Sequence, residues 1–294
     1  MTHCFVYDSN QLETYYNCFV REICSAEELR STTSIKVFLQ SRRKYNALDR
    51  QSKATVTLSR KHFELHRGAK DFVKFIRRFE IGIGLYCDRK DGGETTLQSD
   101  SMVLYATSNA LSRIEATKKT VTAIVNDGLY QTPKQNTVPK NEKEDNDEEE
   151  EDEKTCFMSL DKIFLTALHK SPITKIQRFD VDTQEEKFIA QLDDLLVAEK
   201  ADVILVIRTR SGYHYVVRTG PFMRKMHDFL EKNKELISSD KNGMNGLPGT
   251  LQGGAKVRLI FAKGEANYSQ LPSLLRLQSE SKHATAQTQD QVQS

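Results

Sequence analysis

The stretch that decides the fold runs from Lys175 to Arg218 and reads KIQRFDVDTQEEKFIAQLDDLLVAEKADVILVIRTRSGYHYVVR. Residues 175–181, 201–208 and 213–218 have the β-branched and aromatic content of strands. Between the first two, residues 185–199 place apolar side chains on one helical face: Phe188, Leu192, Leu195 and Leu196. The alternation predicts a mixed α/β (α+β) fold in which a sheet packs against helices.

The same two patterns continue on both sides of this stretch. Downstream, the sequence predicts a helix over 221–234, a Gly-rich segment over 243–254 and a strand over 256–262. Upstream, it predicts helices over 8–29, 68–79 and 159–169, a helix from Ser108, and strands over 34–39, 53–58, 81–87 and 101–106.

The charges divide the chain into parts. Residues 142–153 read EKEDNDEEEEDE, and ten acids with one lysine give them a net charge of −9, which leaves +11 elsewhere. We expect a basic α/β module over 1–130, a disordered acidic linker or inserted loop over 131–154, a second α/β module over 155–278 and a disordered tail over 279–294. The positive charge outside residues 142–153 indicates a polyanionic partner, and nucleic acid is the first candidate. The alternative is that these basic residues form an ordinary solvated surface.

Several classes of protein are excluded by what the sequence lacks. It contains no run of 18 apolar residues, which argues against a transmembrane helix and a membrane partner. The first residues have no basic-then-apolar leader pattern, so we expect an intracellular protein, in the nucleus or cytoplasm. Five scattered cysteines form no CxxC pair, which indicates neither a zinc knuckle nor a disulfide framework.

Three short motifs could carry chemistry. Asp180 and Asp182 end a predicted strand on one face, where two carboxylates repel unless a cation such as Mg²⁺ or Mn²⁺ lies between them. The segment Arg210-Ser211-Gly212-Tyr213-His214 makes a turn that places a histidine beside basic residues, where a phosphate group can bind. The alternatives are a solvated strand end and a structural histidine.

The third motif is Asp240 followed by a glycine-rich loop. Residues 240–254 read DKNGMNGLPGTLQGG, and Lys256 and Arg258 follow directly. Glycines let a backbone approach a ligand closely, and free N–H groups can hold anions. A flexible surface connection is the alternative, and the loop lacks the Gly-Lys-Ser/Thr ending of a Walker A motif.

In this order, the motifs resemble the catalytic core of the archaeo-eukaryotic primase superfamily, over roughly residues 174–260. Asp180 and Asp182 match the family's DxD, Gly212-Tyr213-His214 matches its small-residue-x-His, and Asp240 matches its third motif. The most specific element is the stretch LPGTLQGG, residues 247–254. A divergent or viral-like member of the family is the natural interpretation.

The resemblance implies a DNA or RNA primase-polymerase, that is, a template-dependent nucleotidyltransferase using nucleoside triphosphates. It implies two ions, Mg²⁺ or Mn²⁺, held by the catalytic carboxylates Asp180, Asp182 and Asp240, which would activate a 3′-hydroxyl and stabilise charge on the α-phosphate. It also implies a nucleotide-binding set: His214, Ser211, Arg210, Lys256 and Arg258. Two other interpretations stay open: a catalytically inactive nucleic-acid-binding protein of the same fold, and a protein-interaction domain that uses the acidic segment.

Overall fold

The computed structural model describes residues 5–24, 31–42, 45, 55–80, 86–88, 93–95, 101–127, 160–173, 176–240 and 243–272. The described chain combines α-helices with antiparallel sheets, which confirms the α+β class. It forms two compact units. One consists of Met1–Leu111 with Ile173–Ser294, and the other is Ser112–Pro172.

The decisive stretch and two later strands form a five-stranded sheet, called here the second sheet. Its elements follow the chain as β7 (Ile176–Val181), α6 (Glu186–Ala198), β8 (Val203–Arg208), β9 (Tyr213–Arg218), α7 (Met223–Lys232), β10 (Ile237–Asp240) and β14 (Arg258–Ala262). The strands lie in the order β10-β7-β9-β8-β14, each antiparallel to its neighbours. The succession β-α-β-β-α-β from β7 to β10 is the split βαβ arrangement.

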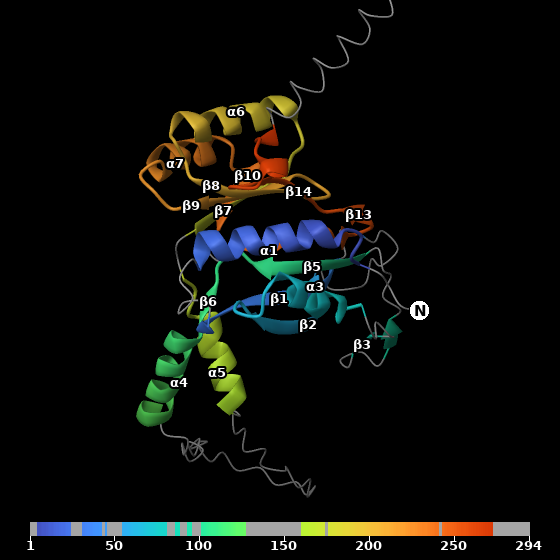
Figure 1. Ribbon diagram of the computed structural model, residues 1–294, viewed down its shortest axis with the longest axis vertical. Helices are drawn as coiled ribbons and strands as arrows, with labels where there is room; N and C mark the ends of the chain where they lie inside the picture. The colour runs from blue at the N-terminus through green and yellow to red at the C-terminus, as the bar shows by residue number, and fades with distance from the viewer. Residues whose placement is uncertain are drawn as a thin grey trace, which may run out of the picture. The chain divides into compact units, whose positions relative to one another are not determined.

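The two faces of the second sheet differ in what covers them. Helices α6 and α7 lie over one face (Figure 1) and close a core with inward-pointing strand residues, among them Phe179, Val181, Tyr215 and Val217. The other face contributes Ile207, Val216 and Leu259 to the core that contains α1 (Ser9–Ile23). Side chains alternate along a strand, so the residues between those facing α6 and α7 point to the α1 side.

A seven-stranded sheet, called here the first sheet, is built mainly from the N-terminal part of the chain. Its main path is β13-β12-β5-β1-β2, with β11 also paired to β5 and β6 to β1. The strands are β1 (Thr33–Arg42), β2 (Thr55–Glu64), β5 (Met102–Thr107), β6 (Leu111–Ser112), β11 (Met244–Gly246), β12 (Leu251–Gln252) and β13 (Ala255–Lys256). A separate small pair joins β3 (Tyr86–Asp88) and β4 (Gly93–Thr95), and a 3₁₀ turn, η3, spans Ala266–Tyr268.

The glycine-rich segment is therefore not a surface connection. Its strands β11 and β12 pair with β5, and the backbone N–H groups of Tyr7 and Asp8 donate to the carbonyl of Gly249 at 2.9 and 3.1 Å. Leu247, Thr250 and Gln252 are buried. Residues from the expected second module thus complete the sheet of the expected first module, and the parts of the two modules before Ser112 and after Pro172 lie in one compact unit.

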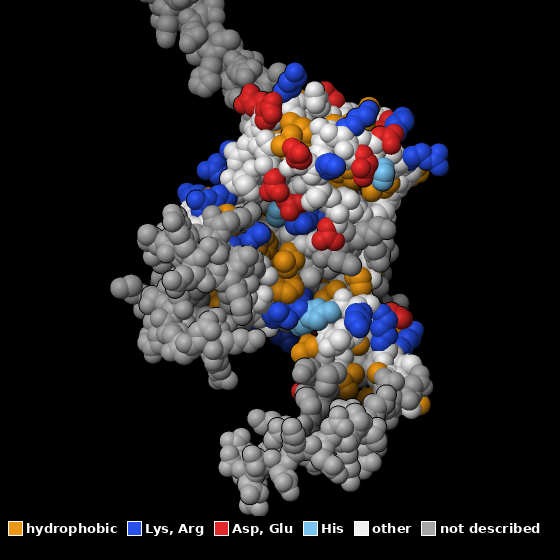
Figure 2. Space-filling view, turned by 180° about the vertical axis from the view of Figure 1, so that it is seen from behind, with side chains coloured by type: hydrophobic (Ala, Val, Ile, Leu, Met, Phe, Trp, Pro, Cys, Tyr) orange, Lys and Arg blue, Asp and Glu red, His pale blue; other side chains and the backbone are white. Residues whose placement is uncertain are grey.

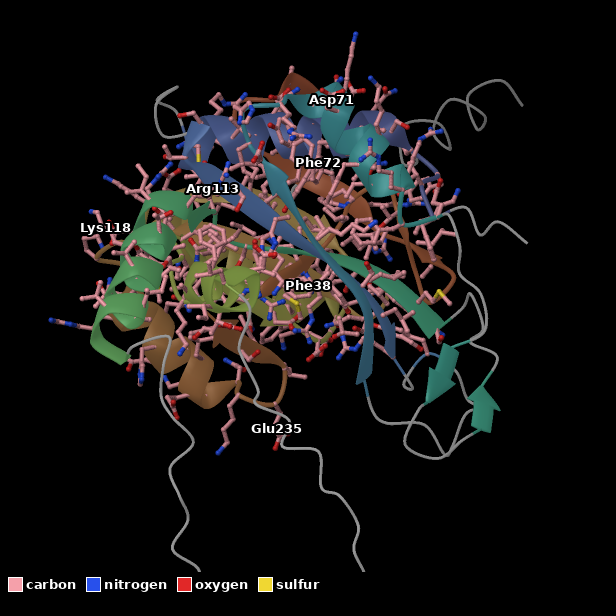
Figure 3. The ribbon with its side chains drawn as sticks, turned by 90° about the horizontal axis from the view of Figure 1, so that it is seen from below. Phe38, Asp71, Phe72, Arg113, Lys118 and Glu235 are labelled. Carbon is pink, nitrogen blue, oxygen red and sulfur yellow. The ribbon has the colours of Figure 1, made fainter. Side chains whose placement is uncertain are left out.

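Helices α1 (Ser9–Ile23) and α3 (Ala69–Arg77) contribute to the apolar core on one side of the first sheet. Helix α1 packs against α3 and against β8 and β14, so it lies between the two sheets (Figure 1). Asp8 begins α1 by accepting hydrogen bonds from the N–H groups of Asn10 and Gln11. Phe72 on α3 and Phe38 on β1 lie on opposite sides of the strands (Figure 3), and the face of Phe38 also carries the buried Lys36, whose Nζ lies 4.6 Å from the centre of the Phe38 ring.

The smaller unit is a helix pair, α4 (Arg113–Asp127) and α5 (Leu160–His169). Helix α4 begins at Arg113 rather than at Ser108, because β6 intervenes and the Ser112 hydroxyl accepts from the N–H of Glu115 at 3.2 Å. The expected disordered segments 131–154 and 279–294 lie outside the described residues, as does most of the expected strand 81–87. No described helix has the length and apolar character needed to cross a membrane.

Candidate functional site

Three segments that carry the primase resemblance meet at one histidine. His214 at the start of β9 lies opposite Asp180 of β7, and its Nε2 is 3.3 Å from Asp180 Oδ1. Its Nδ1 accepts a hydrogen bond from the N–H of Gly246 on β11, at 3.2 Å. The DxD strand, the histidine motif and the segment leading into LPGTLQGG therefore form one hydrogen-bonded chain across the two sheets.

The surroundings of His214 keep its ring neutral. Burial lowers the pKa of His214, and the neighbouring Asp180 opposes that shift only in part. A neutral ring that accepts at Nδ1 carries its proton on Nε2, where it donates to Asp180. Both ring nitrogens are thus engaged within the protein and the residue is 5% exposed. In this arrangement His214 positions Asp180. A triphosphate could bind the ring only by displacing Asp180 or the N–H of Gly246 from it.

The histidine motif requires a glycine at position 212 for a steric reason. A Cβ at Gly212 would lie 1.8 Å from the carbonyl oxygen of Val181, so no larger residue fits without moving the backbone. The turn is closed by the N–H of Gly212, which donates to the Thr209 hydroxyl at 3.2 Å. This close approach holds the β8–β9 turn against the end of β7, directly beside Asp182.

Asp180 has a basic partner as well as His214. Arg178, two residues earlier on β7, places Nη2 3.3 Å from Asp180 Oδ2. The Arg178 side chain is 11% exposed and that of Asp180 is 29% exposed. Sequence reasoning missed Arg178, although strand alternation places it on the same face as Asp180.

The register does not bring all three carboxylates together. Strand β10 runs antiparallel to β7 and places Ser238 opposite Asp180 and Asp240 opposite Arg178. Asp240 is thus a diagonal neighbour of Asp180, at about 7–8 Å between Cα atoms. Asp182 lies level with Leu236, to whose carbonyl its N–H donates, so Asp240 is four residues away along the strand, or about 13 Å.

Asp180 and Asp182 suit a hard divalent cation without Asp240. Asp182 is exposed, and each carboxylate oxygen has a second lone pair, so Asp180 can coordinate while keeping its contacts to Arg178 and His214. Mg²⁺ is commonly held by one or two carboxylates, with the remaining positions filled by water and substrate phosphate. In the described part of the chain, no group of three or more His, Cys, Asp and Glu side chains is arranged for a metal.

Arg210 and Ser211 lie at the exposed tip of the β8–β9 turn. Arg210 Nη1 donates to the carbonyl of Gly253 at 2.7 Å, and its guanidinium lies 5.0 Å from the centre of the Tyr45 ring. Its backbone N–H donates to Gln252. The turn and the end of the LPGTLQGG segment are therefore fastened together.

A polar network on the first sheet was not foreseen from the sequence. Arg42 at the end of β1 donates to the hydroxyl of Tyr105 at 2.7 Å, and the Gln252 amide donates to the hydroxyls of both Tyr45 and Tyr105. Burial lowers the pKa of Arg42, but Tyr105, Tyr45 and the charge of Asp180 together raise it above its ordinary value. Arg42 and Asp180 therefore lie within electrostatic reach of each other. The signal in the sequence that could have pointed to Arg42 is the run of three basic residues at positions 42–44.

Lys256 and Arg258 follow the glycine-rich segment, and their contacts differ from those of Arg42 and Arg210. Lys256 Nζ lies 5.1 Å from the centre of the Tyr7 ring, and Arg258 lies opposite Arg208 at the edge of the second sheet. Both are exposed. Figure 2 shows acidic and basic side chains interspersed over the upper part of the molecule, so the face seen there is not uniformly basic.

Comparisons with known proteins identify no relative. No protein-family model matches the chain, and neither a curated protein nor a solved structure matches it.

Proposed function

We propose that the protein is a primase-polymerase-like nucleotidyltransferase that acts on a nucleic-acid template. The observation that carries this proposal is the chain Asp180–His214–Gly246, in which the three segments of the resemblance contact one another. These segments are separated by more than thirty residues in sequence, and nothing in their separate patterns requires them to meet.

Asp180 and Asp182 would hold Mg²⁺ or Mn²⁺. When bound, such an ion polarises a phosphoryl oxygen and neutralises charge that develops during phosphoryl transfer. The protein's own contribution is orientation. His214 and Arg178 fix both oxygens of Asp180, and Gly212 lets the β8–β9 turn close beside Asp182.

Arg42 and Arg210 supply positive charge near this carboxylate pair. Their guanidinium groups lie 5.9 and 5.0 Å from the Tyr45 ring centre, from opposite parts of the fold. Guanidinium groups bind phosphate through paired N–H donors, and aromatic rings stack on bases. We assign this Arg42–Tyr45–Arg210 cluster to the phosphates of a nucleotide or strand.

Nucleotide incorporation on a primed single-stranded template, with Mn²⁺ or Mg²⁺, tests the proposal. Asp182→Asn removes a charge from an exposed residue and leaves the contacts of Asp180 in place, so we expect a folded protein with at least a hundredfold loss of incorporation. Asp194→Asn on the exposed side of α6 is the matched control and should keep full incorporation. Equal activity of the two variants, or none in the wild type, would reject the proposal.

A second candidate is a nucleic-acid-binding protein of the same fold without catalysis. Its support is the ion pair between Arg178 and Asp180, which neutralises a carboxylate that would otherwise be available to bind a metal ion. This candidate predicts binding of single-stranded nucleic acid that Arg42→Ala and Arg210→Ala weaken, together with no incorporation under any metal condition.

A further inference from the structure

Arg178 occupies an unexpected place between carboxylates. It lies on the same face of β7 as Asp180, contacts Asp180 Oδ2 at 3.3 Å, and is aligned with Asp240 on the neighbouring strand. Directly opposed residues in an antiparallel pair have Cβ atoms about 4.5–5.5 Å apart, a separation at which opposite charges attract. A guanidinium therefore lies where two of the three carboxylates implied by the resemblance converge.

The backbone of the glycine-rich segment holds this guanidinium in place. Arg178 Nη1 donates to the carbonyl of Met244, and a Cβ at Gly243 would lie 2.3 Å from Arg178 Nε. Nε is buried with no hydrogen-bond partner among the described residues. The side chain is thus packed rather than solvated, and swinging it away to admit an ion would break a buried ion pair.

The separation of the carboxylates limits how many ions fit. Asp182 and Asp240 lie about 13 Å apart along the strands, whereas paired catalytic ions lie roughly 3.5–4 Å apart and share ligands.

We propose that Arg178 takes the place of one metal ion, so that the protein binds a single divalent cation, on Asp180 and Asp182. Asp240 then serves as a partner of Arg178 and not as a metal ligand. This inference rests on the proposed function, because it concerns the metal ligands of the same site.

Titration of the full-length protein with Mn²⁺, followed by the electron paramagnetic resonance signal of free Mn²⁺, tests the inference. The wild type should bind one ion. Asp182→Asn should weaken that binding at least tenfold. Asp240→Asn, a change at an exposed residue, should alter the affinity by less than twofold, whereas a three-carboxylate site predicts a loss of tenfold or more.

Variants of Arg178 give a second, independent measurement. Arg178→Met removes the charge and keeps an apolar stem, and it should tighten Mn²⁺ binding at least tenfold or add a second ion. Arg178→Lys restores a cation and should bind one ion as the wild type does. Circular dichroism checks that each variant folds, and if Arg178→Met does not, Asp240→Asn decides the question alone.

The outcomes separate the two proposals. Two ions in the wild type, or a tenfold loss in Asp240→Asn, would overturn the single-ion inference and leave the proposed nucleotidyl transfer standing. No Mn²⁺ binding by the wild type would overturn both.

Discussion

The two faces of β7 and β9 are built from alternate residues of the same strands, yet around Asp180 and His214 they have opposite chemistry. Toward α6 and α7 point Phe179 and Tyr215, which are fully buried. Toward α1 point Asp180 and His214, which are held by polar contacts. The first sheet repeats the division: Val37 lies in the apolar core, while its neighbour Lys36 is buried on the face of Phe38 (Figure 3).

The difference shows what each face requires. An apolar face gains stability from burial alone and tolerates many sequences of similar volume. A buried polar face is stable only when its donors and acceptors are paired, so the identity of each residue matters. A substitution among these paired polar residues therefore changes chemistry as well as stability, whereas one on the face covered by α6 and α7 changes stability alone.

The largest effect should come from the helix-covered face. Phe179→Ala removes a fully buried ring between the second sheet and its helices, and we expect a loss of about 3–5 kcal/mol in the free energy of unfolding. Urea unfolding followed by circular dichroism measures it. A loss below about 1 kcal/mol would show that this face is less tightly packed than the burial indicates.

On the polar face, Asp180→Ala should lower stability by about 1–3 kcal/mol. The repulsion expected between Asp180 and Asp182 predicts the opposite sign, a gain when either is removed. The structure reverses the expectation for Asp180, because its loss leaves a buried guanidinium and a buried histidine donor without their acceptor. Thermal unfolding without added metal measures the change.

Asp182→Ala is the matched control for that experiment. Asp182 is exposed, so its removal should change stability by less than about 0.5 kcal/mol. If both variants were stabilised by similar amounts, carboxylate repulsion would dominate and the contacts of Asp180 would contribute little.

A pH experiment examines the polar face of the first sheet. Burial, with the charge of Lys36 adding to it, lowers the pKa of His62 to about 4. Between pH 6.5 and 4 the unfolded chain binds a proton there that the folded chain does not, so the free energy of unfolding falls as the pH falls. His62→Gln should flatten this dependence, by at most about 1.4 kcal/mol per pH unit.

The exposed His66→Gln provides the comparison for His62→Gln, because it lies just beyond the end of the same strand. Parallel profiles for His62→Gln and the wild type would mean that His62 is protonated equally in both states.

The fold was largely predictable because most of its elements have strong local periodicity. The strands and helices from β7 to α7 end within about two residues of the expected positions. Strands β11 and β12 were missed because they are short, rich in glycine, and defined only by pairing with β5, far earlier in the chain. Such pairing leaves no periodic signal in the segment itself.

The site was predictable only where the resemblance named residues. It singled out Asp180 and His214, and these lie in contact. Arg178 and Arg42 were missed, because an ion pair on a strand face and a side-chain hydrogen bond between neighbouring strands depend on register. Asp240 was placed by motif order, but the antiparallel direction of β10 separates it from Asp182.

The smallest stability effect should come from a residue outside both polar faces. Lys256→Ala removes one exposed charge beside the Tyr7 ring, and stability should change by less than about 0.5 kcal/mol. If this surface binds a single strand, each lost phosphate contact lowers the slope of log affinity against log salt by about 0.7. Lys225→Ala, which removes an exposed lysine on α7 paired with Glu199, controls for the change in net charge. A slope that falls equally in both variants would mean that the strand responds to overall charge, and Lys256 would then have no place in the nucleic-acid path.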